Sequence, residues 1–157
     1  LGNFFFKAVY HIMGVPIWWE RQNPRTILQP GSSPGQCWAF KGAQGSAVIK
    51  LSNPVIVSQV TLEHIPKSLS PDGSVASAPR NFEVFGLDDV DDPNPVLLGN
   101  FTYDTEKIKN PVQTFQVQID EQAFSYVELK VLSNYGHPQY TCLYRFRVHG
   151  SLEHQTH

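Results

Sequence analysis

The sequence is poor in several features whose absence excludes whole classes of protein. Its 157 residues include two cysteines and one methionine, and its formal net charge is -2. No apolar run reaches the ~18 residues that a membrane span needs, since Lys7, His11 and Pro16 interrupt the apolar N-terminal stretch. That stretch also lacks the basic start and small-residue cleavage site of a signal peptide. We therefore expect one globular domain, with any membrane anchor of a parent protein outside this chain.

Charge and motifs narrow the function further. The nearly balanced charge supplies no broad positive field, which disfavours nucleic acid as a partner. The sequence contains no H-E-x-x-H, no G-x-S-x-G, no P-loop and no G-x-G-x-x-G, so the usual signatures of zinc proteases, serine hydrolases and nucleotide-binding enzymes are missing. We therefore expect a binding module and not an enzyme.

What the chain does contain is many short runs of β-branched and aromatic residues that end at Pro, Gly, Asn or Asp. About eight such runs predict strands, at residues 26–28, 46–51, 55–62, 81–85, 96–102, 114–119, 125–132 and 143–149. Turn residues separate several of them, as in SPDG at 70–73 and NYGHP at 134–138. Because no convincing helix lies between them, these strands predict an all-β fold, a compact antiparallel β-sandwich.

Three segments of the sequence each allow two interpretations. Residues 1–22, which crowd apolar side chains around Gly14-Val15-Pro16, form either the first core strand pair or a hairpin arm clamped against a partner. The loop QPGSSPGQC, residues 29–37, is either an ordinary surface loop or one whose backbone carbonyls wrap a cation. Cys37 and Cys142 have no zinc spacing and are either a disulfide or two buried free thiols.

The stretch YGHPQYTCLYRFRVHG near the C-terminus concentrates tyrosine, histidine and cysteine. In an extended backbone Tyr140, Cys142 and Tyr144 share one side of the strand. Phenolic donors in that arrangement suit a carboxylate such as a peptide terminus. Alternatively, the two tyrosines are half-buried residues of the sandwich with satisfied hydroxyls.

Five motifs follow one another in the order and at the spacing of a known family. They are ILQPGSSPGQCWAFKGAQG (27–45), VTLEHIPKSLSP (60–71), SAPRNFEVFGL (77–87), LLGNFTYD (97–104) and NYGHPQYTCLYRFRVHG (134–150). Together they resemble the SUN domain over essentially residues 1–150. The resemblance implies a jelly-roll or discoidin-like β-sandwich with an N-terminal β-hairpin lid at 1–22 and a cation loop at 26–37. The polar residues after it predict a flexible tail at 151–157.

The resemblance also implies a function. SUN domains lie in the perinuclear space as the C-terminal end of inner nuclear membrane proteins, where a preceding coiled coil makes them trimers. They grip the C-terminal tails of KASH proteins of the outer nuclear membrane, such as nesprins, and so form the LINC complex of nuclear anchorage. The implied partner is therefore a KASH peptide, and the implied assembly is a homotrimer of the full-length protein.

Matching positions carry over the family's site residues. Cys37 and Cys142 match its intradomain disulfide. The pocket for the terminal residues and carboxylate of the peptide maps onto His64, Ser77, Tyr140 and Tyr144, because hydroxyls and an imidazole can donate to a carboxylate. The lid, which adds the peptide as a strand, maps its peptide contacts onto Phe5, Phe6, Ile12, Ile17 and Trp18.

The cation loop of the family holds a monovalent ion, K+ or Na+, mainly through backbone carbonyls. The matching positions are Thr26, Gln29, Gly31, Gln36 and, beside them, Tyr144. This sequence departs from the family at two of them, because Asp is common at the Gly31 position and Asn at the Gln36 position. The loop thereby has one negative charge fewer, which weakens any cation site.

Three further expectations complete the sequence analysis. Asn100-Phe101-Thr102 is an N-glycosylation sequon, but its match to a strand motif disfavours an occupied site. A rival function is a discoidin-like module that binds carbohydrate through Trp18, Trp19 and the Gly/Ser loop. The third alternative is a SUN homologue that has lost peptide binding through the altered loop.

Overall fold

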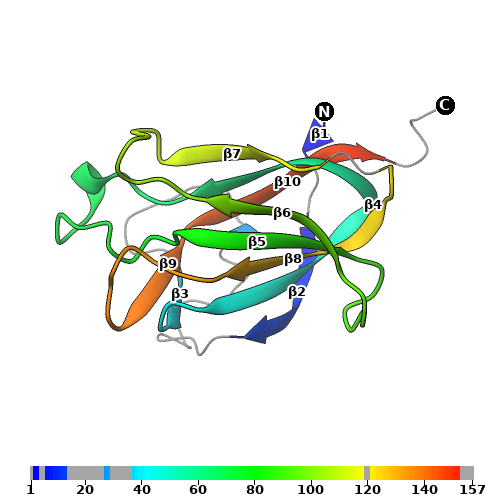
Figure 1. The fold of residues 1–157 in the computed structure, drawn as a ribbon, viewed down its shortest axis with the longest axis horizontal. Coiled ribbons are helices and arrows are strands. Elements are labelled where there is room, and N and C mark those ends of the chain that lie inside the picture. The colour runs from blue at the N-terminus through cyan, green and yellow to red at the C-terminus, as the bar shows by residue number, and fades with distance from the viewer. Residues whose placement is uncertain (1, 4–5, 14–26, 29–36, 119–120, 153–157) are drawn as a thin grey trace.

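Strands account for almost all regular structure in the described part of the chain (Figure 1). The computed structural model describes residues 2–3, 6–13, 27–28, 37–118 and 121–152. A 3₁₀ helix spans Lys67–Leu69. The strands are β1 (Gly2–Asn3), β2 (Phe6–Met13), β3 (Trp38–Lys41), β4 (Gly45–Glu63), β5 (Asn81–Leu87), β6 (Val96–Thr102), β7 (Val112–Gln116), β8 (Phe124–Val131), β9 (Tyr140–Leu143) and β10 (Arg145–Leu152).

The long strand β4 organises the sandwich because it belongs to both layers. Its first part, up to Leu51, lies between β2 and β8. Its second part pairs with β10 from Val55 onward and with β7 from Gln59 onward. The change of layer falls at the exposed Asn53-Pro54, where a missing proline N–H costs no ladder bond. The sequence predicts two strands here, at 46–51 and 55–62, and the structure shows one continuous strand of 19 residues.

The core lies between the two layers and follows the period-two pattern of the strands. Val60 and Leu62 of β4, Phe82 and Val84 of β5 and Phe146 of β10 are all fully buried. A ring cluster of Phe82, Phe101 and Phe115, with centroids 5.1–5.6 Å apart, joins β5, β6 and β7. The predicted antiparallel β-sandwich is therefore confirmed.

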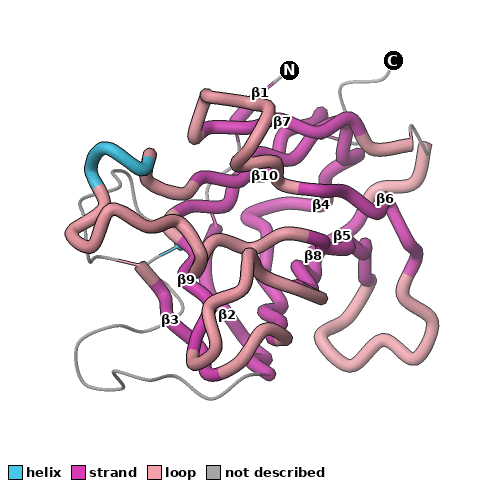
Figure 2. The backbone as a smooth tube through the Cα atoms, turned by 60° about the vertical axis from the view of Figure 1, so that its left-hand side comes forward, coloured by secondary structure: helices cyan, strands magenta, loops and turns pink. Residues whose placement is uncertain are grey.

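A separate two-stranded ribbon, β3 with β9, lies at the end of the sandwich that also holds the 3₁₀ helix (Figure 2). The sequence analysis did not predict β3. It predicts a strand at 26–28, which is wrong for Ile27 and Leu28, because both lie in a 3₁₀ turn. It also predicts a strand that starts at residue 143, whereas the structure ends β9 at Leu143 and begins β10 at Arg145, with Tyr144 between them.

The N-terminal segment is paired to the sandwich through its backbone. β1 pairs with β10, and β2 pairs antiparallel with β4 from Phe6↔Leu51 to Met13↔Ser46. Among the described strands, β4 is the ladder partner of β2. Residues 14–22, which include the return strand of the predicted hairpin, lie outside the described residues. At the other terminus β10 runs to Leu152, two residues into the predicted tail.

Candidate functional site

The site is built around a disulfide between Cys37 and Cys142, whose Cα atoms lie 5.6 Å apart. Cys37 directly precedes β3, and Cys142 lies within β9, where it faces Ala39 in the register of the ribbon. The bond joins positions 105 residues apart in the sequence. It decides between the two interpretations of the cysteines in favour of the disulfide.

Around the disulfide lies a small buried cluster, separate from the main core. The disulfide cluster consists of Cys37, Ala39, Ile65, Cys142 and Tyr144, and Tyr140 packs against it. Tyr140, Cys142 and Tyr144 thus lie together, as their spacing predicts. The break between β9 and β10 positions Tyr144, because its backbone N–H donates to the carbonyl of Glu63 at 3.3 Å and so holds it beside the end of β4.

His64 follows directly after β4 and connects the cluster to Ser77. Its ring packs edge-on against Tyr144, with centroids 5.0 Å apart. Its Nε2 lies 3.5 Å from Ser77 Oγ, and the Ser77 carbonyl accepts a hydrogen bond from the backbone N–H of Cys142 at 2.8 Å. The structure therefore brings together all four residues of the predicted terminus pocket, from the end of β4, the 70–80 segment, β9 and the break between β9 and β10.

Burial sets the charge of His64. The side chain is 3% exposed, and this desolvation lowers its pKa to about 4. The ring is therefore neutral at pH 7. Because the Ile65 carbonyl, 3.0 Å from Nδ1, can only accept, we assign the proton to Nδ1 and leave Nε2 as an acceptor facing Ser77.

This tautomer changes the role predicted for His64. The sequence analysis has the imidazole donate to a carboxylate, but in the neutral ring the one N–H is already directed at the Ile65 carbonyl. Nε2 can accept from the Ser77 hydroxyl instead. His64 consequently orients the Ser77 hydroxyl through Nε2.

His137 orders the turn that leads into β9. Its Nδ1 accepts from the backbone N–H groups of Gln139 and Tyr140, both at 3.2 Å, and its ring lies 3.8 Å from that of Tyr140. The side chain of Asn134 donates to the carbonyl of Tyr140 at 3.3 Å. The turn therefore fixes Tyr140 at the edge of the disulfide cluster.

Other predicted site residues lie outside what the structure describes. Phe5, Ile17 and Trp18 of the lid are among these, and Phe6 and Ile12 are described only by their strand pairing in β2. Of the positions predicted for the cation only Tyr144 is described, since Thr26, Gln29, Gly31 and Gln36 fall in the undescribed ranges. Over the described residues, no three His, Cys, Asp or Glu side chains gather as a metal site would require.

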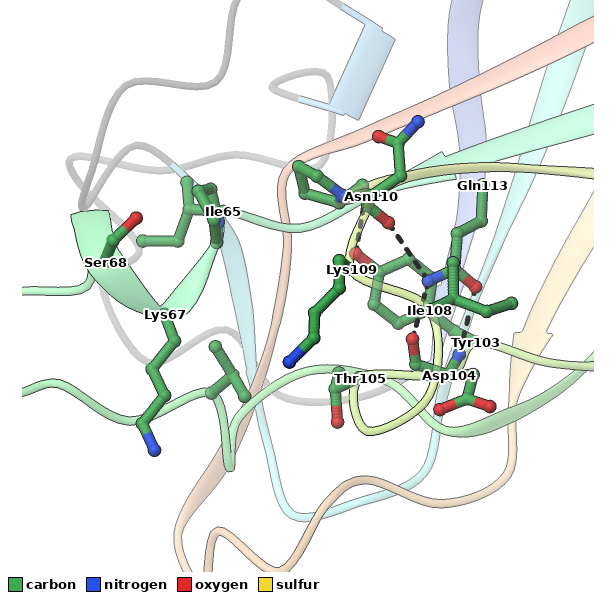
Figure 3. Close-up of a pocket in the computed structure, with 13 residues that line it drawn as sticks. Ile65, Lys67, Ser68, Tyr103, Asp104, Thr105, Ile108, Lys109, Asn110 and Gln113 are labelled. Carbon is green, nitrogen blue, oxygen red and sulfur yellow. Dashed lines mark hydrogen bonds between the residues drawn. The ribbon is translucent and has the colours of Figure 1, made fainter.

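A cavity of about 270 Å³ lies next to the site, and the sequence analysis did not predict it (Figure 3). Ile65, which belongs to the disulfide cluster, also lines this cavity. Tyr103 forms a wall, donates to the Pro111 carbonyl at 2.6 Å and accepts from the backbone N–H of His64 at 3.2 Å. Lys67 and Lys109 line it from two different segments. The lining comes from three separated stretches of chain, so no local pattern signals it.

The fold and the site together define a class: an antiparallel β-sandwich with a disulfide-stapled cluster of tyrosine and histidine at one end. Solved structures support the fold. A family 32 carbohydrate-binding module from Streptococcus pneumoniae EndoD matches with a TM-score of 0.74 at 16% identity, over 96% of this chain and 100% of that one. A module from a Clostridium perfringens family 31 glycoside hydrolase matches with a TM-score of 0.68 at 12% identity, over 94% and 96%. At these identities the likeness concerns the fold alone.

The chain belongs to the SUN domain family: the family model described as Sad1 / UNC-like C-terminal matches residues 17–152. SUN domain-containing protein 2 of Mus musculus is 49% identical over 94% of this chain and 20% of its own length. SUN domain-containing protein 1 of Homo sapiens is 50% identical over 91% of this chain and 18% of its own length. The Klaroid protein of Drosophila melanogaster is 48% identical over 92% of this chain and 15% of its own length. The chain thus spans about a fifth or less of the length of these relatives.

Within the described part of the chain, no helix has both the length and the apolar character for a membrane crossing.

Proposed function

We propose that this domain binds the C-terminal KASH peptide of outer nuclear membrane proteins from within the perinuclear space. In this proposal it is the lumenal end of an inner nuclear membrane protein that forms homotrimers, and it links nucleus and cytoskeleton as part of a LINC complex. Its role is binding and not catalysis. The observation that carries the proposal is the convergence of His64, Ser77, Tyr140 and Tyr144 at the Cys37–Cys142 disulfide.

The chemistry of the two tyrosines favours a carboxylate ligand. Tyr140 and Tyr144 carry phenolic donors, whereas the single proton of the Ser77 hydroxyl is directed at His64 Nε2. A hydrogen bond to a charged group contributes about 1.5–3 kcal/mol, so phenols can hold a chain terminus without a cationic side chain. The disulfide favours this use because it keeps β3 and β9 in fixed relation, and a rigid site loses less entropy on binding.

The backbone arrangement of β2 favours strand addition by the rest of the peptide. Among the described strands β2 is the edge strand of its layer, on the side of β4 opposite β8. An extended peptide gains affinity from main-chain bonds at such an edge, while side chains set its register. Phe5, Phe6, Ile12, Ile17 and Trp18 are the lid contacts that we propose, and K+ or Na+ in the 26–37 loop is a further part of the proposal.

The test is calorimetric titration of the protein with a synthetic KASH C-terminal peptide. We expect the unmodified protein to bind the peptide, and Tyr144→Phe to weaken the affinity about tenfold or more. The matched control Tyr126→Phe, which alters a β8 tyrosine outside the disulfide cluster, should leave the affinity unchanged. A peptide extended by one residue beyond its carboxylate should not bind. Unchanged affinity for the extended peptide would overturn the terminus pocket.

A second experiment tests the rival function, carbohydrate binding. The fold neighbours include carbohydrate-binding modules, and a glycan array run on the same protein measures that alternative directly. Clear glycan hits without peptide binding would support a discoidin-like carbohydrate module, whereas absence of both would support a homologue that has lost peptide binding.

A further inference from the structure

Asn100 and Thr102 occupy the outward face of β6, at the edge of the sheet. Both side chains are exposed. β6 ends the strand order and, of the described strands, its ladder partner is β5, where Asn100 faces Glu83 and Thr102 faces Asn81 (Figure 1). The Thr102 hydroxyl donates to the Asn81 side chain at 3.0 Å. The sequon Asn100-Phe101-Thr102 therefore presents both of its polar side chains on one exposed face.

The residue between them anchors the strand from the other side. Phe101 faces inward, opposite Phe82, and its ring lies 5.6 Å from that of Phe82 and 5.2 Å from that of Phe115. A group attached to Asn100 consequently extends away from the core and does not disturb this packing. From the sequence, the position of Asn100 in a strand disfavours a glycan at this residue. In the structure the side chain is exposed on the last strand of the described order, where a large substituent has room.

We propose that Asn100 carries an N-linked glycan. The inference rests on the lumenal placement of the proposed function, because the dolichol-pyrophosphate oligosaccharide donor is used in the endoplasmic reticulum lumen. In the transfer the Asn100 side-chain nitrogen forms a bond to the anomeric carbon of the sugar. The bond from that carbon to the pyrophosphate breaks, and the amide releases one proton. Asn100 is in the sole N-x-S/T sequon of the 157 residues.

The position gives this glycan a physical role. β6 is last in the order of described strands, and such an edge invites pairing with another chain. Its Leu98 carbonyl accepts from the Gln118 N–H at 3.2 Å, and Leu97 is 48% exposed. Beside it lies a groove of about 300 Å³ lined by Leu98, Phe101 and Gln116, among others. A hydrated oligosaccharide on Asn100 covers this edge and keeps the face formed by β5 and β6 out of protein interfaces.

The test is the gel mobility of the natural full-length protein from cultured animal cells, with and without endoglycosidase H. We expect an enzyme-sensitive step that is lost in Asn100→Gln and Thr102→Ala and retained in Thr102→Ser, which preserves the sequon. No such step at Asn100 would overturn the inference.

A reporter variant separates that failure from a failure of lumenal placement. Asp72→Asn creates an N-G-S sequon in the exposed turn at 70–74. A step from the reporter without one from Asn100 overturns the glycan and leaves the lumenal placement intact. If neither sequon gives an enzyme-sensitive change in mobility, both the lumenal placement and the glycan are overturned.

Discussion

Acid should destabilise the protein through His64. Burial lowers the pKa of this side chain from the ordinary 6.5 to about 4, while in the unfolded chain it keeps the ordinary value. Below pH 6.5 the unfolded state therefore takes up a proton that the folded state does not, so the free energy of unfolding falls with pH until about pH 4. At 1.36 kcal/mol per pKa unit the full effect is about 3 kcal/mol.

The assay is urea unfolding of the oxidised protein and of His64→Gln at several pH values from 7.5 to 4.5. The difference in unfolding free energy between the two proteins should shrink by about 2.5 kcal/mol over this range, because the variant lacks the titrating ring. Partial burial also lowers the pKa of His149, but that residue is present in both proteins and cancels in the difference. A difference that stays constant from pH 7.5 to 4.5 would refute the buried, neutral state assigned to His64.

Three further predictions concern stability and are measured by denaturant unfolding. Reduction of the Cys37–Cys142 bond, which closes a loop of 105 residues, should lower the free energy of unfolding by about 4–5 kcal/mol; a loss below 1 kcal/mol would contradict a constraint on the unfolded chain. Tyr103→Phe should cost about 1–3 kcal/mol, since it removes the bonds to the Pro111 carbonyl and the His64 N–H. Gly150→Ala should cost at least about 1–3 kcal/mol, because its Cβ would fall on the Ile56 carbonyl oxygen, whereas Ser151→Ala next to it should be nearly neutral.

The strands that local patterns predict well are those whose ends are marked by turn residues. β6 occupies the predicted residues 96–102, and β5 and β8 differ from prediction only at their ends. The SPDG turn also forms as expected, with Gly73 at φ 68° and its N–H donating to the Ser70 carbonyl at 3.1 Å. In these segments local propensity and tertiary pairing agree.

Prediction failed where long-range pairing overrides local signals. Asn53-Pro54 looks like a break, but strands on both sides of β4 hold its two parts in one strand. Trp38–Lys41 shows no alternation, because its first three residues are all buried, and it becomes a strand through β9.

Some features of the candidate site could likewise be predicted from the sequence, and others could not. Family motifs identified His64, Ser77, Tyr140 and Tyr144, yet the proton position on His64 depends on the Ile65 carbonyl, which no sequence pattern reveals. The cavity behind Ile65 likewise needed the fold, since its walls come from stretches that are neighbours only in space.

The shared strand β4 has a consequence for how the native state opens. Where each sheet has its own strands, one sheet can exchange its amide hydrogens while the other stays closed. Here the amides of Val48 and Val60 lie in one strand, the first paired with β2 and β8, the second with β7 and β10. Detaching either layer frays the other, so hydrogen exchange at the centre of both layers should proceed by a single cooperative opening.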